Sequence, residues 1–229
     1  MFDRNYFEEG SYGKQEAKII QRNYYHLLNE ATRVFPKIFS NRYHRYKILD
    51  FGCGYGAGTY FLSKYFPNSL IIAIDISLYA IEKAKRLYPL RNIVYLTLDL
   101  ANRKSLELLR SYTNDEDFDI IFTRDVLEHI PVEKHHLYIE AFASILKIDG
   151  IIVAQTPNKY NILAHIIDRT HIGLGTPHYW YEKFSRYFSW VKIKVKQYVP
   201  IIWKISKRRI FIEFIFPLLG FNIYIFARK

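Results

Sequence analysis

The stretch Ile48-Leu49-Asp50-Phe51-Gly52-Cys53-Gly54-Tyr55-Gly56-Ala57-Gly58 carries a short apolar run into a turn in which every second residue is glycine. Glycine permits the backbone dihedrals of a tight turn and lets a ligand approach the main chain closely. In a doubly wound α/β sheet, a turn of this kind after the first strand lines the crevice where nucleotide-like ligands bind. The stretch therefore predicts a nucleotide-type site at the carboxyl end of a buried strand.

The rest of the chain alternates between apolar runs and helix-like segments. The predicted strands are residues 46–51, 70–74, 92–97, 118–123 and 151–155, and the predicted helices are 14–35, 58–66, 78–87, 103–111 and 132–146. The strands are rich in Ile, Val and Leu throughout, as expected when helices cover both faces of a sheet. This alternation predicts a parallel α/β sheet of the doubly wound, Rossmann-like class. A further helix at 179–188 and strands at 191–196 and 221–226 complete the predicted elements.

Two acidic residues follow the second and third predicted strands. Asp75 stands about 20 residues past the glycine turn, where a carboxylate accepts hydrogen bonds from two ribose hydroxyls. Asp99 is placed to meet an adenine amino group. Because Gly52, Gly54 and Ala57 also satisfy the nicotinamide-dinucleotide pattern, an oxidoreductase is an alternative. Asp50 disfavours it, since a carboxylate there would repel a pyrophosphate and welcome a cationic amino group.

The segment Asp50–Gly56 resembles motif I of class I S-adenosylmethionine (SAM)-dependent methyltransferases. Residues 118–121 followed by 125–130, and residues 150–153 followed by 156–158, are similar to later segments of the ubiquinone-biosynthesis-like branch. Residues 168–172 resemble an Asp-x-Thr-His-hydrophobic motif of related methyltransferases. The resemblance covers roughly residues 46 to 188, and it is specific for cofactor and fold rather than for the acceptor.

The resemblance implies a sheet of seven strands in the order 3-2-1-4-5-7-6, with an antiparallel last strand. Residues 221–226 would be the reversed strand, and residues 191–196 would form the edge of the sheet. It also implies an N-terminal helical lid, assigned to residues 1–45, before a methyltransferase domain at residues 46–229 that belongs to the same structural unit.

Roles for individual residues also follow from the resemblance. Asp50 would orient the amino group of SAM, directly or through water, and Asp75 would bind its ribose hydroxyls. Asp99, with the backbone of Leu100, would contact the adenine. The remaining cofactor contacts are assigned to Gly52, Cys53, Gly54, Gly56, Arg124 and Asp125.

Three histidines fall after the fourth and fifth strands, on the side expected for the methyl acceptor. His129, His171 and His178 are candidates for the base that removes a proton from an acceptor hydroxyl. An aromatic wall for the acceptor is expected from Tyr6, Phe7, Tyr12, Tyr179 and Trp180, together with His171 and His178. No group of histidines and carboxylates shows metal-ligand spacing along the sequence, so no metal is predicted.

Charge is concentrated near the C-terminus. The net charge is +11, and nine basic residues but no acidic ones lie between Lys183 and Arg209. Lysines at 192, 194 and 196 are typical of a protected sheet edge, with an anionic partner or a membrane surface as alternatives. The mixed basic and apolar segment Pro200–Leu219 is predicted to cover the acceptor site, with at most weak membrane-surface contact.

Together with the glycine turn, the resemblance implies a SAM-dependent methyltransferase, acting by O-methylation on a small-molecule or lipid-linked acceptor. The alternatives are a nicotinamide oxidoreductase and a non-catalytic protein that binds the cofactor. The single cysteine excludes a disulfide framework. With no signal peptide or apolar span in the sequence, a cytoplasmic protein without specific nucleic-acid binding is expected. Nothing in the sequence indicates an oligomeric state.

Overall fold

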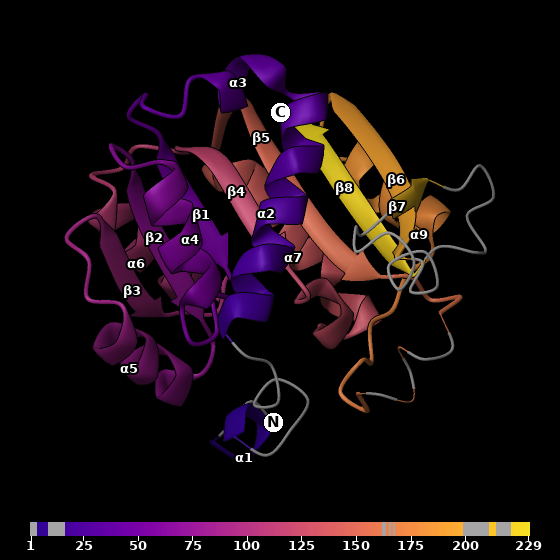
Figure 1. The fold of residues 1–229 in the computed structure, drawn as a ribbon, viewed down its shortest axis with the longest axis horizontal. Helices are drawn as coiled ribbons and strands as arrows, with labels where there is room; N and C mark the ends of the chain where they lie inside the picture. The colour runs from indigo at the N-terminus through magenta and orange to yellow at the C-terminus, as the bar shows by residue number, and fades with distance from the viewer. Residues whose placement is uncertain are drawn as a thin grey trace, which may run out of the picture.

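The computed structural model describes residues 4–8, 17–161, 164, 166, 168–198, 211–213 and 221–229. Its centre is one mixed sheet with the strand order β3-β2-β1-β4-β5-β8-β6-β7 (Figure 1). The strands are β1 (Lys47–Phe51), β2 (Leu70–Asp75), β3 (Ile93–Thr97), β4 (Phe118–Arg124), β5 (Leu146–Pro157), β6 (Trp190–Tyr198), β7 (Phe211–Glu213) and β8 (Asn222–Arg228). The first five strands are parallel, while β8 runs antiparallel to both β5 and β6.

Helices cover both faces of this sheet. The helices are α1 (Arg4–Glu8), α2 (Ala17–Val34), α3 (Pro36–Ser40), α4 (Ala57–Tyr65), α5 (Leu78–Leu87), α6 (Arg103–Tyr112), α7 (His135–Ile145) and α9 (Pro177–Ser185). Helices α2 to α5 pack in one hydrophobic core with side chains such as Ile48 and Phe122, and α6, α7 and α9 pack in the other with Leu49 and Ile121. Neighbouring residues of one strand point to opposite faces, which explains why the strands are apolar throughout. The predicted doubly wound fold is confirmed.

The far edge of the sheet differs from the prediction. Strand β6 pairs with β8, but its last residues, Lys196 to Tyr198, also pair with β7. Residues 191–196 are therefore not a free edge along their whole length, and the sheet has one short strand more than the seven expected.

The lysines of β6 do not all serve to protect an exposed edge. Lys196 is only 4% exposed, and its Nζ lies 2.7 Å from Oε1 of Glu30 on α2, while Lys194 Nζ lies 3.3 Å from Oε2. Arg33 binds the same carboxylate. Burial alone would raise the pKa of Glu30, but the hydrogen bond and charge of Lys196, with the charges of Lys194 and Arg33, lower it overall. The alternating lysines thus join β6 to α2, a role that their spacing did not predict.

The predicted N-terminal lid divides into two parts. Helices α2 and α3 belong to the core, where Leu27 and Leu28 are fully buried. Helix α1 alone lies apart from the sheet layers, at the end where the strands β1 and β2 terminate (Figure 1). Its Glu8 accepts hydrogen bonds from Lys83 and Tyr79 of α5. Among the residues of the segment 1–45 that the structure describes (4–8 and 17–45), α1 is therefore the part positioned as a cover.

Two sequence expectations fall largely outside the described residues. Tyr12 is one, and the segment Pro200–Leu219 is the other, apart from the three residues of β7. Among the helices that the structure describes, none has the length and apolar character to cross a membrane.

Candidate active site

The carboxyl ends of β1, β2, β3 and β4 border a cavity of about 240 Å³. Helix α1 contributes Tyr6 and Phe7 to it, helix α7 contributes Tyr138, and the strand ends and the loops after them contribute the rest. The lining residues are Tyr6, Phe7, Phe51, Gly52, Gly54, Asp75, Ile76, Leu98, Asp99, Asp125, Val126, His129, Ile130, Pro131, Lys134 and Tyr138. The site lies where a doubly wound sheet binds its ligands, because adjacent strands β1 and β4 continue to opposite sides at this point.

The glycine turn needs its glycines for both conformation and space. Gly52, Gly54 and Gly56 have positive φ values of 77°, 52° and 81°, a region that other residues rarely adopt. A Cβ atom on Gly52 would lie 2.2 Å from Cγ2 of Val126, in the loop after β4. The turn is thus packed against the neighbouring loop, and its Gly52 and Gly54 border the cavity.

Asp75 and Asp99 stand at the cavity as predicted. Asp75 is 9% exposed; its Oδ2 accepts from the backbone N–H of Gly54 at 2.9 Å and its Oδ1 from that of Ser77 at 2.9 Å. Burial raises the pKa of Asp75, and these backbone donors oppose that rise. Asp99 accepts a hydrogen bond from the hydroxyl of Tyr138 on α7 at 2.7 Å. The two acids therefore occupy fixed positions at the ends of β2 and β3.

Asp50 lies beneath the turn and not on the described cavity wall. Its side chain is fully buried, and its two oxygens accept from Tyr24 at 2.8 Å and Thr59 at 2.6 Å. Burial raises the pKa of Asp50 to about 6, although these two hydrogen bonds oppose the shift. Cys53 is also buried, and burial raises the pKa of its thiol. A contact of Asp50 with a ligand would require its partners to yield or a water to intervene.

Arg124 and Asp125 form an ion pair at the end of β4. The amide of Gln155 donates to Oδ1 of Asp125 at 3.0 Å, and Asp125 has a positive φ of 53°. Asp125 borders the cavity, whereas Arg124 and the buried Leu100 are not among its lining residues. The left-handed backbone conformation of Asp125 turns the chain sharply into the segment that contains His129.

His129 lines the cavity from a single 3-10 turn, Leu127–His129. Its Nδ1 lies 2.9 Å from Oγ1 of Thr170 and 3.3 Å from the carbonyl oxygen of Thr170. Burial, followed by the nearby His171, lowers the pKa of His129 to about 4. The imidazole is therefore neutral near pH 7, and the aromatic ring of Tyr6 packs edge-on against it.

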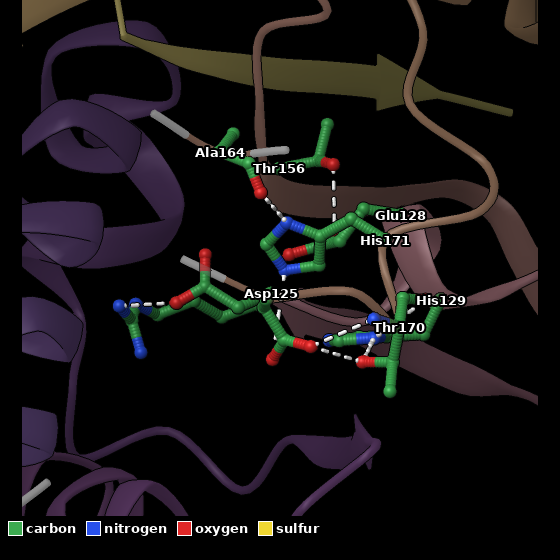
Figure 2. Close-up of polar contacts among 9 residues, drawn as sticks. Asp125, Glu128, His129, Thr156, Ala164, Thr170 and His171 are labelled. Carbon is green, nitrogen blue, oxygen red and sulfur yellow. Dashed lines mark hydrogen bonds and ion pairs between the residues drawn. The ribbon is translucent and has the colours of Figure 1, made fainter. Parts of the chain in front are cut away.

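His171 and Glu128 lie beside His129 (Figure 2). The two imidazole rings have their centres 4.8 Å apart. Glu128 is fully buried, and its Oε2 accepts from the hydroxyl of Thr156 at 3.0 Å. Burial, with the nearby charge of Asp125, raises the pKa of Glu128 well above its ordinary value. One oxygen of Glu128 and one ring nitrogen of each histidine lie within 4.8 Å of one another.

The third candidate histidine lies elsewhere. The side chain of His178 is 81% exposed and lies 3.7 Å from the carboxylate of Glu182 on the same helix. Trp180 and Tyr179 pack around His135, which is 1% exposed and receives a hydrogen bond from Tyr179. The aromatic wall expected from Tyr179 and Trp180 is thus core packing, while Tyr6 and Phe7 do border the cavity.

Sequence reasoning missed Glu128, Thr170 and Tyr138. Glu128 follows from no spacing signal, because its partners Thr156 and His171 come from distant segments. Thr170 stood inside the Asp-x-Thr-His motif and could have been identified from it. Tyr138 could have been found only from its place on the helix that faces Asp99.

The comparisons with known proteins agree with this architecture. Residues 44–188 match the family model described as a methyltransferase domain. A ubiquinone biosynthesis O-methyltransferase of Haemophilus ducreyi is 26% identical over 134 residues, covering 58% of this chain and 55% of that protein. A trans-aconitate 2-methyltransferase of an Enterobacter species is 25% identical over 122 residues, covering 53% and 43%. The chain thus spans about half the length of the curated relatives that it matches.

Solved structures share the fold over nearly the whole chain. A SAM-dependent methyltransferase from Archaeoglobus fulgidus superposes with a TM-score of 0.66 at 19% identity, covering 98% of both chains. The family match spans more than half of the present chain. The chain therefore belongs to the methyltransferase-domain family, and its fold is that of the class I SAM-dependent methyltransferases, as the resemblance of its glycine turn implied.

Proposed function

We propose that this protein binds SAM in the cavity described above and transfers its methyl group to a hydroxyl oxygen of a small molecule or of a lipid-linked head group. The observation that carries the proposal is the joint position of the glycine turn, Asp75 and Asp99 on one cavity wall. Membership of the methyltransferase-domain family supports the reaction type. The O-methyltransferase among the matched relatives supports oxygen as the acceptor atom.

The strand order gives the direction in which the cofactor would lie. Asp99 follows β3 and Asp75 follows β2, so the adenosyl group would extend across these two strand ends. The methionine part would then cross the turn at Gly52 and Gly54 toward Asp125 after β4. Adenine would meet Asp99, and the ribose hydroxyls would meet the carboxylate of Asp75. In this arrangement the sulfonium group faces the side that carries His129.

The reaction itself is a direct displacement. The acceptor oxygen donates an electron pair to the methyl carbon, the carbon–sulfur bond breaks, and its electron pair stays on sulfur, giving S-adenosylhomocysteine. The protein has to align oxygen, carbon and sulfur, and such alignment can supply about 7–11 kcal/mol of the barrier. The hydroxyl proton also has to leave. The imidazole of His129 lines the cavity and that of His171 packs against it, so these two groups are the candidates for accepting the proton.

The walls favour an acceptor that presents a small polar group. Tyr6, Phe7 and Pro131 give the remaining space an apolar lining, while His129 gives it a polar end. A cavity of about 240 Å³ must hold most of the cofactor as well. These dimensions favour a compact acceptor, or the head group of a larger one, beside the cofactor.

The test is methyl transfer from isotope-labelled SAM by the purified protein. A panel of hydroxylated small molecules and a lipid extract would be offered as acceptors, and the products would be identified by mass spectrometry. We expect a labelled methyl ether or ester, lost in Gly54→Val because the side chain intrudes at the turn. Binding of SAM without transfer to any acceptor would favour a non-catalytic role, and preferential binding of a nicotinamide dinucleotide would overturn the proposal.

A further inference from the structure

Glu128, His129 and His171 form a group of potential metal ligands beside the cavity. Glu128 and His129 come from the turn after β4, and His171 comes from the loop that follows β5. Figure 2 shows the three side chains gathered within one small volume, and one candidate ligand atom from each lies within 4.8 Å of the other two. Two imidazoles and one carboxylate are a frequent ligand set for catalytic metal ions.

Glu128 supplies an independent indication of a missing ligand. Its side chain is fully buried, and Thr156 occupies Oε2 only. Within the part of the chain that the structure describes, Oε1 is buried and has no hydrogen-bond partner. A buried oxygen left in this way is unfavourable, so such atoms call for a specific explanation. A bound cation would satisfy it.

The hydrogen bonds of the histidines determine which ring nitrogen faces the group. Nδ1 of His171 lies 2.6 Å from the carbonyl oxygen of Ala164, which can only accept, so this nitrogen carries the proton (Figure 2). The hydroxyl of Thr170 donates its single hydrogen to Oδ1 of Asp168 at 2.6 Å, and it therefore accepts from Nδ1 of His129. In the neutral form of both rings Nδ1 is therefore the donor and Nε2 carries the lone pair. Nε2 of His171 also lies 4.0 Å from Oδ2 of Asp168, so a second carboxylate stands beside the group.

This arrangement is the one that metal-binding histidines show. A ligating imidazole nearly always donates its other N–H to a carbonyl, a carboxylate or a similar acceptor, which fixes the ring and its tautomer. Here the carbonyl oxygen of Ala164 accepts the hydrogen bond from His171. The hydroxyl of Thr170, which is itself bound to Asp168, accepts the hydrogen bond from His129. The Asp-x-Thr-His motif thus contains one proposed ligand, His171. Its Asp168 and Thr170 hold the ring of a second proposed ligand, His129.

We propose that Oε1 of Glu128 and Nε2 of His129 and His171 bind a divalent first-row transition-metal ion, represented by Zn²⁺, with one or more positions left for water or substrate. Two nitrogen ligands disfavour Mg²⁺ and Ca²⁺, which prefer oxygen ligands. Bonds of ~2.0–2.2 Å place neighbouring ligands of one ion ~3–4 Å apart, so the group would close by about 1 Å on binding.

The consequence for catalysis rests on the proposed function, whereas metal binding does not. An acceptor oxygen bound to the ion would lose its proton at a lower pH, because a metal ion stabilises the negative charge of the deprotonated oxygen. The electron pair then attacks the methyl carbon as described above, and the proton passes to solvent. The site would accordingly select acceptors whose hydroxyl can reach the ion.

The test is titration of tag-free, chelator-treated protein with Co²⁺, whose bound form absorbs visible light. We expect a saturable absorption band that Zn²⁺ abolishes by competition and that a large excess of Mg²⁺ leaves unchanged. Glu128→Gln and His171→Ala should each weaken Zn²⁺ binding at least tenfold, and Thr170→Val should weaken it about 10–100-fold by releasing the His129 ring. His178→Ala is the matched control, because it removes a histidine outside the group.

Circular dichroism of each variant separates a folding defect from a loss of ligands. A wild-type protein that gives no cobalt band, or folded Glu128→Gln and His171→Ala variants that bind Zn²⁺ as tightly as wild type, would overturn the metal site. Calorimetry with SAM is run in parallel on the same samples. Zn²⁺ binding without SAM binding would refute the proposed function and leave the metal site standing. SAM binding without Zn²⁺ binding would refute the metal site and leave the proposed function standing.

Discussion

The hydroxyl of Tyr24 on α2 donates a hydrogen bond of 2.8 Å to Oδ1 of Asp50 at the end of β1, and both side chains are buried. The ring of Tyr24 also covers Gly58, where an added Cβ would lie 2.2 Å from it. One tyrosine thus connects the helix before the sheet to the acid and the glycine turn at the carboxyl end of β1. The packing of the glycine turn thus includes a segment outside the family match.

Replacing Tyr24 by Phe should destabilise the protein without disturbing its shape. The variant leaves Asp50 with Thr59 as its one remaining side-chain donor, and an unsatisfied buried acceptor costs about 1–3 kcal/mol. Urea denaturation would measure the change in the free energy of unfolding. Tyr25→Phe, at a half-exposed neighbouring position, is the control and should change it by less than about 0.5 kcal/mol. Equal stability of the two variants would contradict this role.

Asp50 should make the stability depend on pH in an unusual direction. Burial raises its pKa from 3.8 to about 6, so the folded state holds the proton more tightly than the unfolded state. The contribution of this residue is greatest below about pH 4 and falls as the pH rises to about 6, by roughly 3 kcal/mol at 1.36 kcal/mol per pKa unit.

The difference between wild type and Asp50→Asn isolates this effect from other titrating groups. Urea denaturation from pH 4 to pH 7 should show wild-type stability declining relative to the variant, with no further relative change above about pH 6. A relative stability that rises with pH in this window would show that the pKa of Asp50 is lowered and not raised.

Asp75 should contribute strongly to SAM affinity. We expect a dissociation constant in the micromolar range, about −8 kcal/mol. Asp75→Ala would lose two charge-assisted hydrogen bonds of about 1.5–3 kcal/mol each, and hence at least tenfold in affinity by calorimetry. Because Asp75 also holds Gly54 and Ser77, circular dichroism must confirm the fold. Glu140→Ala, at an exposed acid on α7, should bind normally, and an unaltered affinity in Asp75→Ala would remove Asp75 from the site.

The ion pair between α2 and β6 should be sensitive to loss of one partner. Glu30→Gln leaves the buried ammonium of Lys196 without its charge partner, and such changes cost about 3–5 kcal/mol. Combining Glu30→Leu with Lys196→Leu should recover most of that loss, because well-packed apolar residues often replace a buried ion pair without penalty. The exposed Lys192 of the same strand, changed to Ala, is the control in the denaturation series. A cost below about 1 kcal/mol for Glu30→Gln would mean that the pair is effectively hydrated.

Helix α1 should act on cofactor affinity through Phe7 and not through its surface ion pair. Phe7 is 3% exposed and borders the cavity, so Phe7→Ala should open the cover and weaken SAM binding about tenfold. Glu8→Gln removes the charge that pairs with Lys83 at a partly exposed position, where such pairs contribute about 0–1 kcal/mol. Calorimetry should therefore separate the two variants clearly, and equal effects would assign the cover to the ion pair.

The sequence by itself determined the order and type of the elements that border the cavity. Apolar runs such as residues 70–74 are stable as strands of a sheet that is covered on both faces. The glycines at 52, 54 and 56 indicate a turn with positive φ. The strands from β1 to β5 and the positions of Asp75 and Asp99 followed from these local patterns. Local patterns are informative there because each element and its turn are contiguous in the chain.

Tertiary structure alone decided which distant residues meet. The spacing of the lysines on β6 predicted edge protection, but in the fold Glu30 of α2 pairs with Lys196. His171 and His178 were equal candidates in the sequence, but in the fold His171 packs against His129 while His178 lies exposed on α9. Glu128 stood inside the family-like segment 125–130, but nothing along the sequence indicated a role for it, because Thr156 and His171 reach it only through the fold. The physical reason is that burial and short-range contacts set the charge and chemistry of such groups, and both arise only when separate segments pack together.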